Sequence, residues 1–275
     1  MTLKEICTLI DLQPEMTSRV LAFADTSDVP SYLPLMNGFD RRETYNDAVS
    51  ALKNALGKDE DNVKITACML YKACVLHDTF YREKGIGDDI FRDTMACFTR
   101  FIGECVVKTG RVAFDREWWV PRQLSGVLFR VGVLEYELTA DGEGQKCVSI
   151  HIPSGSDLTR ENCVVSLHAA KAFLRQFFPA YADVTVCCHS WLLSDDLRAN
   201  LPEGSRIRQF QDLFDRTPTG ARGNGFILWL FQTDDTTHIE PLIAKTSLQK
   251  KMKDYLLRGG VLDDVKGVVK KEYLC

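Results

Sequence analysis

The sequence predicts an α+β or α/β fold, in which an N-terminal helical subdomain precedes a mixed β-sheet flanked by helices. Three observations lead to this prediction. Apolar residues recur at three- and four-residue spacing over residues 41–111, which is typical of packed helices. Residues 127–152 are rich in strand-forming residues and contain a turn signal. Residues 145–190 then spell strand, helix and strand.

The composition is that of an ordinary globular protein, with 275 residues, 45% hydrophobic and 26% charged. The net charge of −4 argues against general nucleic-acid binding, which needs a basic surface. No apolar run approaches the ~20 residues that cross a bilayer, and charges interrupt the first apolar segment where a signal peptide has none. We therefore expect a cytoplasmic protein with no nucleic-acid or membrane partner.

The ten cysteines do not form a recognisable disulfide or metal pattern. There is no Cys-x-x-Cys pair, and no histidine lies at zinc-finger spacing. Cys187 and Cys188 are adjacent, but neighbouring strand residues point to opposite faces. We expect reduced thiols that pack as small hydrophobic residues, and no metal. The other eight are scattered along the chain: Cys7, Cys68, Cys74, Cys97, Cys105, Cys147, Cys163 and Cys275.

Residues 1–112 are predicted to form a helical domain, and residues 113–275 the sheet domain. The helical domain begins with a hairpin of two helices, followed by a proline-containing loop over residues 25–40. Trp118 and Trp119 follow the boundary. Adjacent aromatic residues are typical of a packing wedge between subdomains, and stacking on a ligand is the alternative.

Residues 127–138 are predicted to form one continuous strand, and residues 146–152 its antiparallel partner, because Asp-Gly-Glu-Gly between them is a hairpin signal. Glu135 and Glu137 share one face of the first strand. Paired carboxylates can act as general bases. On an antiparallel sheet, a face exposed to solvent is the more ordinary interpretation of such a pair.

A small polar loop of Ser154, Gly155 and Ser156 follows the second strand and precedes a long helix, which Thr159 or Asp157 can cap. Backbone N–H groups converge at such loops and can bind anions. The loop lacks the glycine spacing of a P-loop or of a dinucleotide fingerprint.

The last strand of the strand-helix-strand unit ends in His189, Ser190 and Trp191. A right-handed crossover makes the two strands parallel, so that their C-terminal ends lie at one edge of the sheet. This topology places His151 and Ser154 at the edge that carries His189 and Ser190. The alternative is structural: a hydrogen-bonded histidine, a serine that caps a helix and a tryptophan in the core.

Beyond this unit, residues 206–214 are predicted to form a strand, residues 216–224 a loop and residues 226–231 a buried strand. Ser247 is predicted to cap a basic helix. The tail after residue 261 adds a last strand or helix.

Four segments resemble those of a group of bacterial acyltransferase-like proteins: R-Q-L-S-G-V-L-F-R-V-G-V-L-E-Y-E, H-I-P-S-G-S-D-L-T, S-L-H-A-A-K-A-F and C-H-S-W-L-L-S. That group couples an N-terminal helical domain to a C-terminal domain of GNAT-like fold. The similarity covers nearly the whole chain, most firmly residues 122–214. It implies transfer of an acyl group from acyl-coenzyme A to an amine.

In the GNAT superfamily, two central parallel strands splay apart and hold the pantetheine arm of coenzyme A between them. The pyrophosphate rests on the N-terminus of the intervening helix. The resemblance therefore implies that acetyl-CoA or another acyl-CoA is the cosubstrate, bound by Ile150, Ile152, Ser154, Gly155 and Ser156.

This chain departs from the superfamily pattern at two places. The usual pyrophosphate loop Q/R-x-x-G-x-G/A is replaced by S-G-S-D-L-T-R-E, which has one glycine and two acidic residues. The frequent tyrosine acid after the second strand is also missing, and His189 and Ser190 stand there instead.

These observations lead to the hypothesis of an N-acyltransferase. Glu135 or His151 would deprotonate the amine, which attacks the thioester, and His189 or Ser190 would protonate the departing thiolate. Backbone N–H groups near Ile152 would polarise the carbonyl.

Trp118, Trp119 and Trp191 are the candidates for binding the acceptor, a small-molecule or peptide amine. The sequence leaves the acceptor, the acyl chain length and the oligomeric state open. One alternative function is a non-catalytic ligand-binding or sensing module on the same fold. A cysteine-dependent hydrolase that uses Cys188 and His189 is the other.

Overall fold

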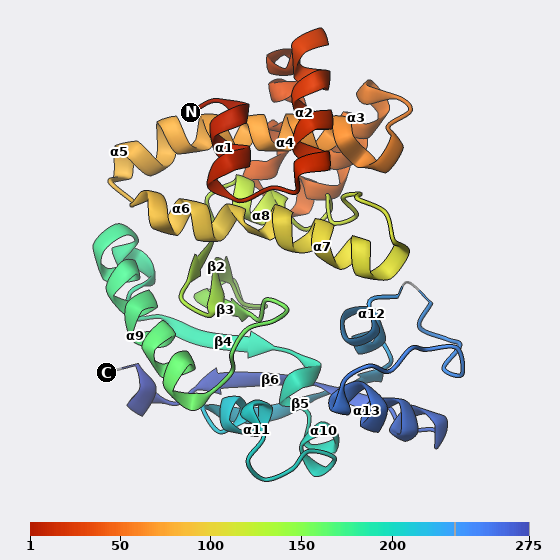
Figure 1. Cartoon of the computed structure of the whole chain (residues 1–275). Helices are drawn as coiled ribbons and strands as arrows, with labels where there is room; N and C mark the ends of the chain where they lie inside the picture. Colours follow the sequence, from red (N-terminus) through yellow and green to blue (C-terminus); the bar gives the residue numbers. More distant parts are fainter. Residues whose placement is uncertain (234, 275) are drawn as a thin grey trace. The chain divides into compact units, whose positions relative to one another are not determined.

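The computed structural model describes residues 1–233 and 235–274, so Cys275 lies outside the described residues. The chain divides into two compact units, Met1–Arg130 and Val131–Cys275 (Figure 1). The first unit is helical and the second contains the sheet, as the sequence predicts. The domain boundary between residues 112 and 113 stays a prediction.

The first unit is built around helix α4, which buries ten of its residues. Such all-round burial is expected of a helix surrounded by other elements, and α1, α2, α3 and η1 all pack against α4. The segment predicted as a loop over residues 25–40 is largely a 3-10 helix, η1. The elements of this unit are α1 Leu3–Leu9, α2 Pro14–Thr26, η1 Val29–Asp40, η2 Arg42–Thr44, α3 Tyr45–Leu56, η3 Glu60–Asn62, α4 Val63–Leu76, η4 His77–Tyr81, α5 Arg82–Lys84, α6 Asp88–Met95, α7 Cys97–Thr109 and α8 Pro121–Leu124.

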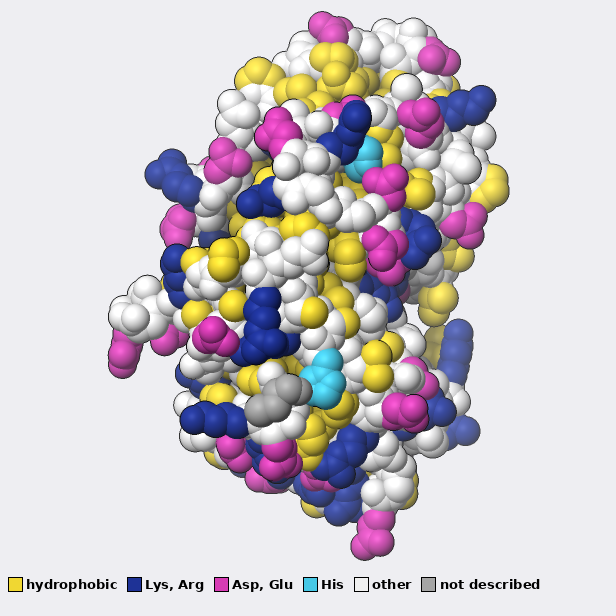
Figure 2. Space-filling model, turned by 90° about the vertical axis from the view of Figure 1, so that its left-hand side faces the viewer, with side chains coloured by type: hydrophobic (Ala, Val, Ile, Leu, Met, Phe, Trp, Pro, Cys, Tyr) yellow, Lys and Arg dark blue, Asp and Glu magenta, His cyan; other side chains and the backbone are white. Residues whose placement is uncertain are grey.

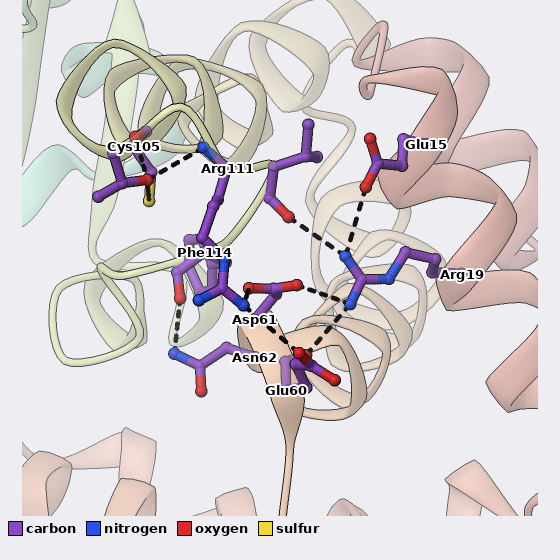
Figure 3. Close-up of polar contacts among 10 residues, drawn as sticks. Glu15, Arg19, Glu60, Asp61, Asn62, Cys105, Arg111 and Phe114 are labelled. Atoms are coloured by element: carbon purple, nitrogen blue, oxygen red, sulfur yellow. Dashed lines mark hydrogen bonds and ion pairs between the residues drawn. The ribbon is translucent and has the colours of Figure 1, made fainter.

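An ion-pair network around Asp61 holds the start of α4 in place (Figure 3). The carboxylate of Asp61 lies 2.8 Å from the guanidinium of Arg19 and 2.6 Å from that of Arg111. The side chain of Asn62 donates to the carbonyl of Phe114 at 2.6 Å. Asp61 and Asn62 both adopt the left-handed backbone conformation, which short polar residues tolerate better than most.

The six-stranded sheet has the order β1-β2-β3-β4-β6-β5, and β1 begins in the first unit and ends at the start of the second. The pairings β2–β3, β4–β6 and β5–β6 are antiparallel, whereas β3–β4 is parallel. Helix α9, Arg160–Phe177, connects β3 to β4 and packs on the sheet (Figure 1). This confirms the predicted strand-helix-strand unit. The strands are β1 Leu128–Val131, β2 Leu134–Ala140, β3 Lys146–His151, β4 Thr185–His189, β5 Phe214–Gly223 and β6 Leu262–Val269.

The continuous strand predicted over residues 127–138 is wrong. The chain turns between β1 and β2, and Gly132 takes a φ of +66° in that turn. The sequence pattern misses the turn because the flanking residues on both sides are apolar and strand-forming. A lone glycine within a strand pattern is a signal for such an irregularity.

Three predictions in the C-terminal part are also wrong. Residues 206–214 form mainly a helix, α11 Arg206–Gln211, and the predicted loop over residues 216–224 belongs to β5. Residues 226–231 form helix α12, Phe226–Phe231, which buries Phe226 and Ile227 in a separate apolar cluster. Helices α10 (Asp195–Ala199) and α13 (Ser247–Leu257) also contribute to this cluster. Short apolar runs do not distinguish a strand from a buried helix by periodicity.

The end of the chain is close to the prediction. The basic helix is α13, Ser247–Leu257, and its cap is Thr246 rather than Ser247, because the Thr246 hydroxyl accepts from the N–H of Gln249 in a capping box. The tail supplies β6, which lies between β4 and β5. The remaining short elements are η5 Pro179–Tyr181, η6 Trp191–Leu193, α10 Asp195–Ala199 and η7 Lys271–Tyr273.

Two surface findings bear on partners. Among residues 1–233 and 235–274, no helix combines the length and apolar character needed to cross a bilayer. Figure 2 shows basic and acidic side chains intermixed over the face that it draws.

Candidate active site

The two parallel strands stop pairing before they end. The pairing of β3 with β4 consists of Cys147 with Thr185, Val148 with Val186 and Ser149 with Cys187. Both strands continue for two more residues, and in the described part of the chain these residues are not paired with each other. Backbone groups of two neighbouring strands thus become available at one edge of the sheet.

Two buried carboxylates and a histidine share one face of β2 and β3. Glu135 lies directly opposite His151 in the antiparallel register, and Glu137 lies one pleat further along β2. The intervening Tyr136 points to the other face, where its hydroxyl lies 2.9 Å from the Ser166 hydroxyl of α9. The carboxylates therefore lie on the face away from α9.

The interpretation of Glu135 and Glu137 as a solvent-exposed pair is wrong. Each residue is only 2% exposed. Burying a carboxylate is costly unless polar partners surround it. Glu137 has such a partner in His151, whose Nε2 atom lies 2.7 Å from Oε2 of Glu137.

The histidine keeps contact with solvent while its carboxylate partner does not. The His151 side chain is 22% exposed and that of Glu137 is 3% exposed. A partly exposed imidazole that is oriented by a buried carboxylate can exchange a proton with a bound molecule. Glu137 was not among the predicted catalytic residues, although its parity with Glu135 and its place diagonal to His151 could have indicated it.

His189 lies at the same end of the sheet as His151. The register of Ser149 with Cys187, extended by two residues, brings both histidines to the same height and the same face. On its other side, His189 is paired with Lys266 of β6. His189 is exposed, and its side chain makes no hydrogen bond among the described residues.

Ser190 and Trp191 make the contacts expected of structural residues, namely a helix cap and a packed tryptophan. The Ser190 hydroxyl accepts from the N–H of Leu192 at 3.1 Å and so caps η6. The Trp191 ring lies 5.4 Å from that of Phe226 and packs against the apolar cluster of α10, α12 and α13. These contacts favour structural roles for both residues. Catalysis by Ser190 and acceptor binding by Trp191 stay predictions.

The predicted anion-binding loop is a tight turn. Gly155 takes a φ of +78°, and the Ser156 N–H donates to the carbonyl of Pro153 at 3.2 Å. The Ser156 hydroxyl donates to the carbonyl of Val133 at 2.8 Å, so it is already used in holding the loop. Ser154 and Gly155 are exposed.

The N-terminus of α9 is partly occupied by the chain itself. Thr159 is the cap, and its hydroxyl accepts from the N–H of Asn162 at 3.4 Å. The N–H of Arg160 donates to the side-chain oxygen of Gln209 at 3.0 Å. Two backbone donors that could hold a phosphate are thereby engaged.

Two cations lie beside this helix start. Arg206 contacts the carboxylate of Asp157 at 3.2 Å, and the Arg160 guanidinium lies over the ring of Tyr273 at 5.2 Å. The side chains of both arginines are exposed. They supply positive charge next to a loop that lacks the usual glycines.

Trp118 and Trp119 belong to the first unit. Their rings meet edge to face at 5.7 Å, and the Arg122 guanidinium lies 4.3 Å from the Trp119 ring. Trp118 is 38% exposed. Their part in binding a substrate stays a prediction.

The nine described cysteines are all buried. Burial raises the pKa of the Cys163 thiol to about 12 and that of the Cys187 thiol to about 11. Burial also raises the pKa of Cys188, which shares the face of Val186 toward α9, whereas His189 points the other way. These facts argue against the cysteine hydrolase, because a thiolate is the nucleophile in that chemistry.

We expect iodoacetamide to leave Cys163, Cys187 and Cys188 unmodified in the native protein at neutral pH. Burial favours the neutral thiol of Cys163 in the folded protein. Its contribution to the free energy of unfolding is therefore present below pH 9 and is lost as the pH rises toward 12. Mass spectrometry of labelled peptides measures this, in a Cys275→Ser background with a urea-unfolded control. Rapid native labelling of Cys188 would contradict its burial.

Comparison with protein families agrees with the fold. The family model of the N-acyltransferase N-terminal domain matches residues 1–126, and that of the GNAT-like C-terminal domain matches residues 128–269. The chain belongs to the family of the GNAT-like C-terminal domain, whose model covers more than half of the chain. The predicted family and the GNAT-like fold are thereby confirmed, and β3, α9 and β4 form the central unit of the GNAT-like domain. A comparison with curated proteins gives no match.

Solved structures of acyltransferases share the fold. One, in complex with decanoyl-CoA and teicoplanin, is 20% identical, with a TM-score of 0.77 over 97% of this chain and 86% of that one. A second, in complex with CoA and 10C-teicoplanin, is 19% identical, with the same TM-score and coverage. A third, in complex with decanoyl-CoA, is 19% identical, with a TM-score of 0.76 over 96% of this chain and 86% of that one.

Proposed function

We propose that this protein moves an acyl group from acyl-CoA to an amine, with His151 as the general base. The single observation that carries the proposal is the contact of His151 with buried Glu137, next to the point where β3 and β4 stop pairing. The position suits a base, because a thioester lying along the unpaired strand ends would have its carbonyl carbon near this edge.

The donor would bind along the end of β3. Backbone groups of Ile150 and Ile152 are available to the amides of a pantetheine arm, since β4 does not pair with β3 beyond Ser149. Ser154 and Gly155, together with Arg160 and Arg206 beside the helix start, would meet the pyrophosphate. The arginines would compensate for the missing glycines by charge.

The chemical step conserves atoms and charge. His151 takes a proton from the amine nitrogen, which forms a bond to the thioester carbon while the carbonyl electrons move to oxygen. The backbone N–H near Ile152 would stabilise that oxyanion. The oxyanion electrons then re-form the carbonyl as the carbon–sulfur bond breaks, and the thiolate takes a proton from His189, whose side chain makes no hydrogen bond among the described residues.

Glu135 is the second candidate base, because it lies directly opposite His151. Ser190 is less suited as an acid, since its hydroxyl caps η6. The Ser190→Ala and His189→Gln variants separate the two candidates for the acid.

The acceptor is proposed to be a small molecule or a peptide that carries an amine. The acyltransferase of the same fold that was solved with teicoplanin and decanoyl-CoA supports this class of acceptor and a medium-length acyl chain. Because acyl-CoA is a cytoplasmic metabolite, we place the protein in the cytoplasm. No role in binding nucleic acid is proposed.

The experiment is a thiol-release assay on the full chain with acetyl-, octanoyl- and decanoyl-CoA. The amines are glucosamine, a lysine-containing peptide and teicoplanin, and mass spectrometry detects the amide product. We expect amide formation with at least one pair, and its loss in a His151→Gln variant. Absence of both product and calorimetric binding for every acyl-CoA would contradict the proposal.

The second candidate function is a binding or sensing module without turnover. It is favoured by the engagement of the Arg160 and Asn162 N–H groups, which leaves fewer donors for a pyrophosphate. Calorimetric binding of acyl-CoA without amide formation from any tested amine would support this function instead.

A further inference from the structure

The contact between His151 and Glu137 joins a partly exposed imidazole to a buried carboxylate. Nε2 of His151 lies 2.7 Å from Oε2 of Glu137, although Glu135 is the residue directly opposite His151 in the register. The imidazole therefore leans diagonally along β2 toward Glu137. The register fixes the backbone positions of the three residues, and the side-chain conformation of His151 brings Nε2 to Glu137.

The hydrogen bond has a direction. An ionised carboxylate can only accept, so a ring nitrogen that faces ionised Glu137 carries the proton. In a neutral imidazole the other nitrogen, Nδ1, then holds the lone pair. The side chain of Glu137 is 3% exposed, so water screens its attraction for an imidazolium only weakly.

We propose that Glu137 is the positioning residue of the acyl transfer: it holds His151 in the Nε2–H tautomer, so that Nδ1 accepts the amine proton. The inference rests on the proposed function, in which His151 is the base. During the step, the proton leaves the amine nitrogen for Nδ1, and the resulting imidazolium keeps its Nε2–H bond to Glu137. The proton then passes to solvent, which restores the neutral ring.

The conservative variants of Glu137 differ in what they can offer to Nε2. Glu137→Gln keeps the length but can turn its NH₂ group toward the ring, which favours the Nδ1–H tautomer. Glu137→Asp keeps the charge and shortens the reach by one methylene. Glu143→Gln is a matched control, because it removes the same charge from an exposed position in the turn between β2 and β3.

The first readout is the tautomer of His151 in the full chain, measured by nitrogen-15 NMR of histidine-labelled protein. The His151 signals are assigned by their loss in His151→Gln. We expect the Nε2–H form in the wild type and in Glu143→Gln, and a shift toward Nδ1–H in Glu137→Gln. A wild-type Nδ1–H tautomer would overturn the inference, even if the Glu137→Gln variant does not fold.

The second readout is kinetic, with decanoyl-CoA and the amine of the panel that gives product. We expect Glu137→Gln to lower kcat by up to about 10²- to 10⁴-fold with KM for decanoyl-CoA unchanged, and Glu137→Asp to recover part of kcat. Wild-type kcat in Glu137→Gln would overturn the inference while the proposed function stands. If the wild type makes no product, the proposed function fails, and the NMR readout still decides the tautomer.

Discussion

Replacing His151 by glutamine is expected to lower kcat by about 10²- to 10⁴-fold, the usual contribution of a general base. Glutamine retains an NH₂ donor that can reach Glu137, so the buried carboxylate keeps a hydrogen-bond partner. The free energy of unfolding should therefore change little. KM for acyl-CoA should also stay close to the wild-type value, because the donor is proposed to bind through backbone groups.

The control for this variant is His168→Gln. His168 is exposed on α9, and the substitution removes the same type of side chain from outside the proposed site. Initial rates with decanoyl-CoA and the active amine separate the two variants. If His151→Gln retained full kcat, the base would have to be another group, and Glu135→Gln would be the next variant to measure.

The second large effect is expected from Gly132→Ala, which should lower the free energy of unfolding by about 2 to 5 kcal/mol. Gly132 has a φ of +66°, where a Cβ atom is strained. That Cβ would also lie 3.2 Å from the Cβ and Oγ of Ser166. Ser166 cannot move aside easily, because its hydroxyl bonds to the Val131 carbonyl and to the Tyr136 hydroxyl.

Comparison with Gly144→Ala separates the cost of steric crowding at Gly132 from the cost of backbone strain. Gly144 has a φ of +78° in the β2–β3 turn, and a Cβ there would meet nothing within 4 Å. We expect it to cost only about 1 to 2 kcal/mol. Urea unfolding followed by circular dichroism measures both variants, and equal losses would show that Ser166 accommodates the methyl group.

The sequence predicts the central unit well because its signals agree with one another. The strand before Ser154, the capped helix that begins after Thr159 and the β-branched strand that ends in His189 form a pattern that right-handed crossover topology resolves into parallel neighbours. This topology alone predicts that His151 and His189 lie at the same edge of the sheet. The helical first unit followed from its regular apolar spacing.

The catalytic geometry was only partly predictable. Alternation shows that Glu135 and Glu137 share a face, but whether that face is buried depends on what packs against it. The alternation therefore predicts that the two glutamates share a face, but it does not predict that this face is buried. The diagonal partnership of Glu137 with His151 depends on the hairpin register, which residues far from either side chain determine.

The C-terminal errors have a related cause. The apolar run of α12 is compatible with a strand or a helix, and its burial in a separate cluster decides for the helix. Strand β5 contains Pro218 and two glycines, which are typical of loops. It is a strand because it lies at the sheet edge and pairs with β6, where proline is tolerated.

The position of β6 also constrains how the protein can fold during synthesis. β4 and β5 are separated in the sheet by a strand that the ribosome makes later than both. Until Leu262–Val269 has emerged, the nascent chain exposes two open strand edges, which can pair with other chains. Completion of the six-stranded sheet must therefore follow translation of β6, and until then the open edges favour aggregation.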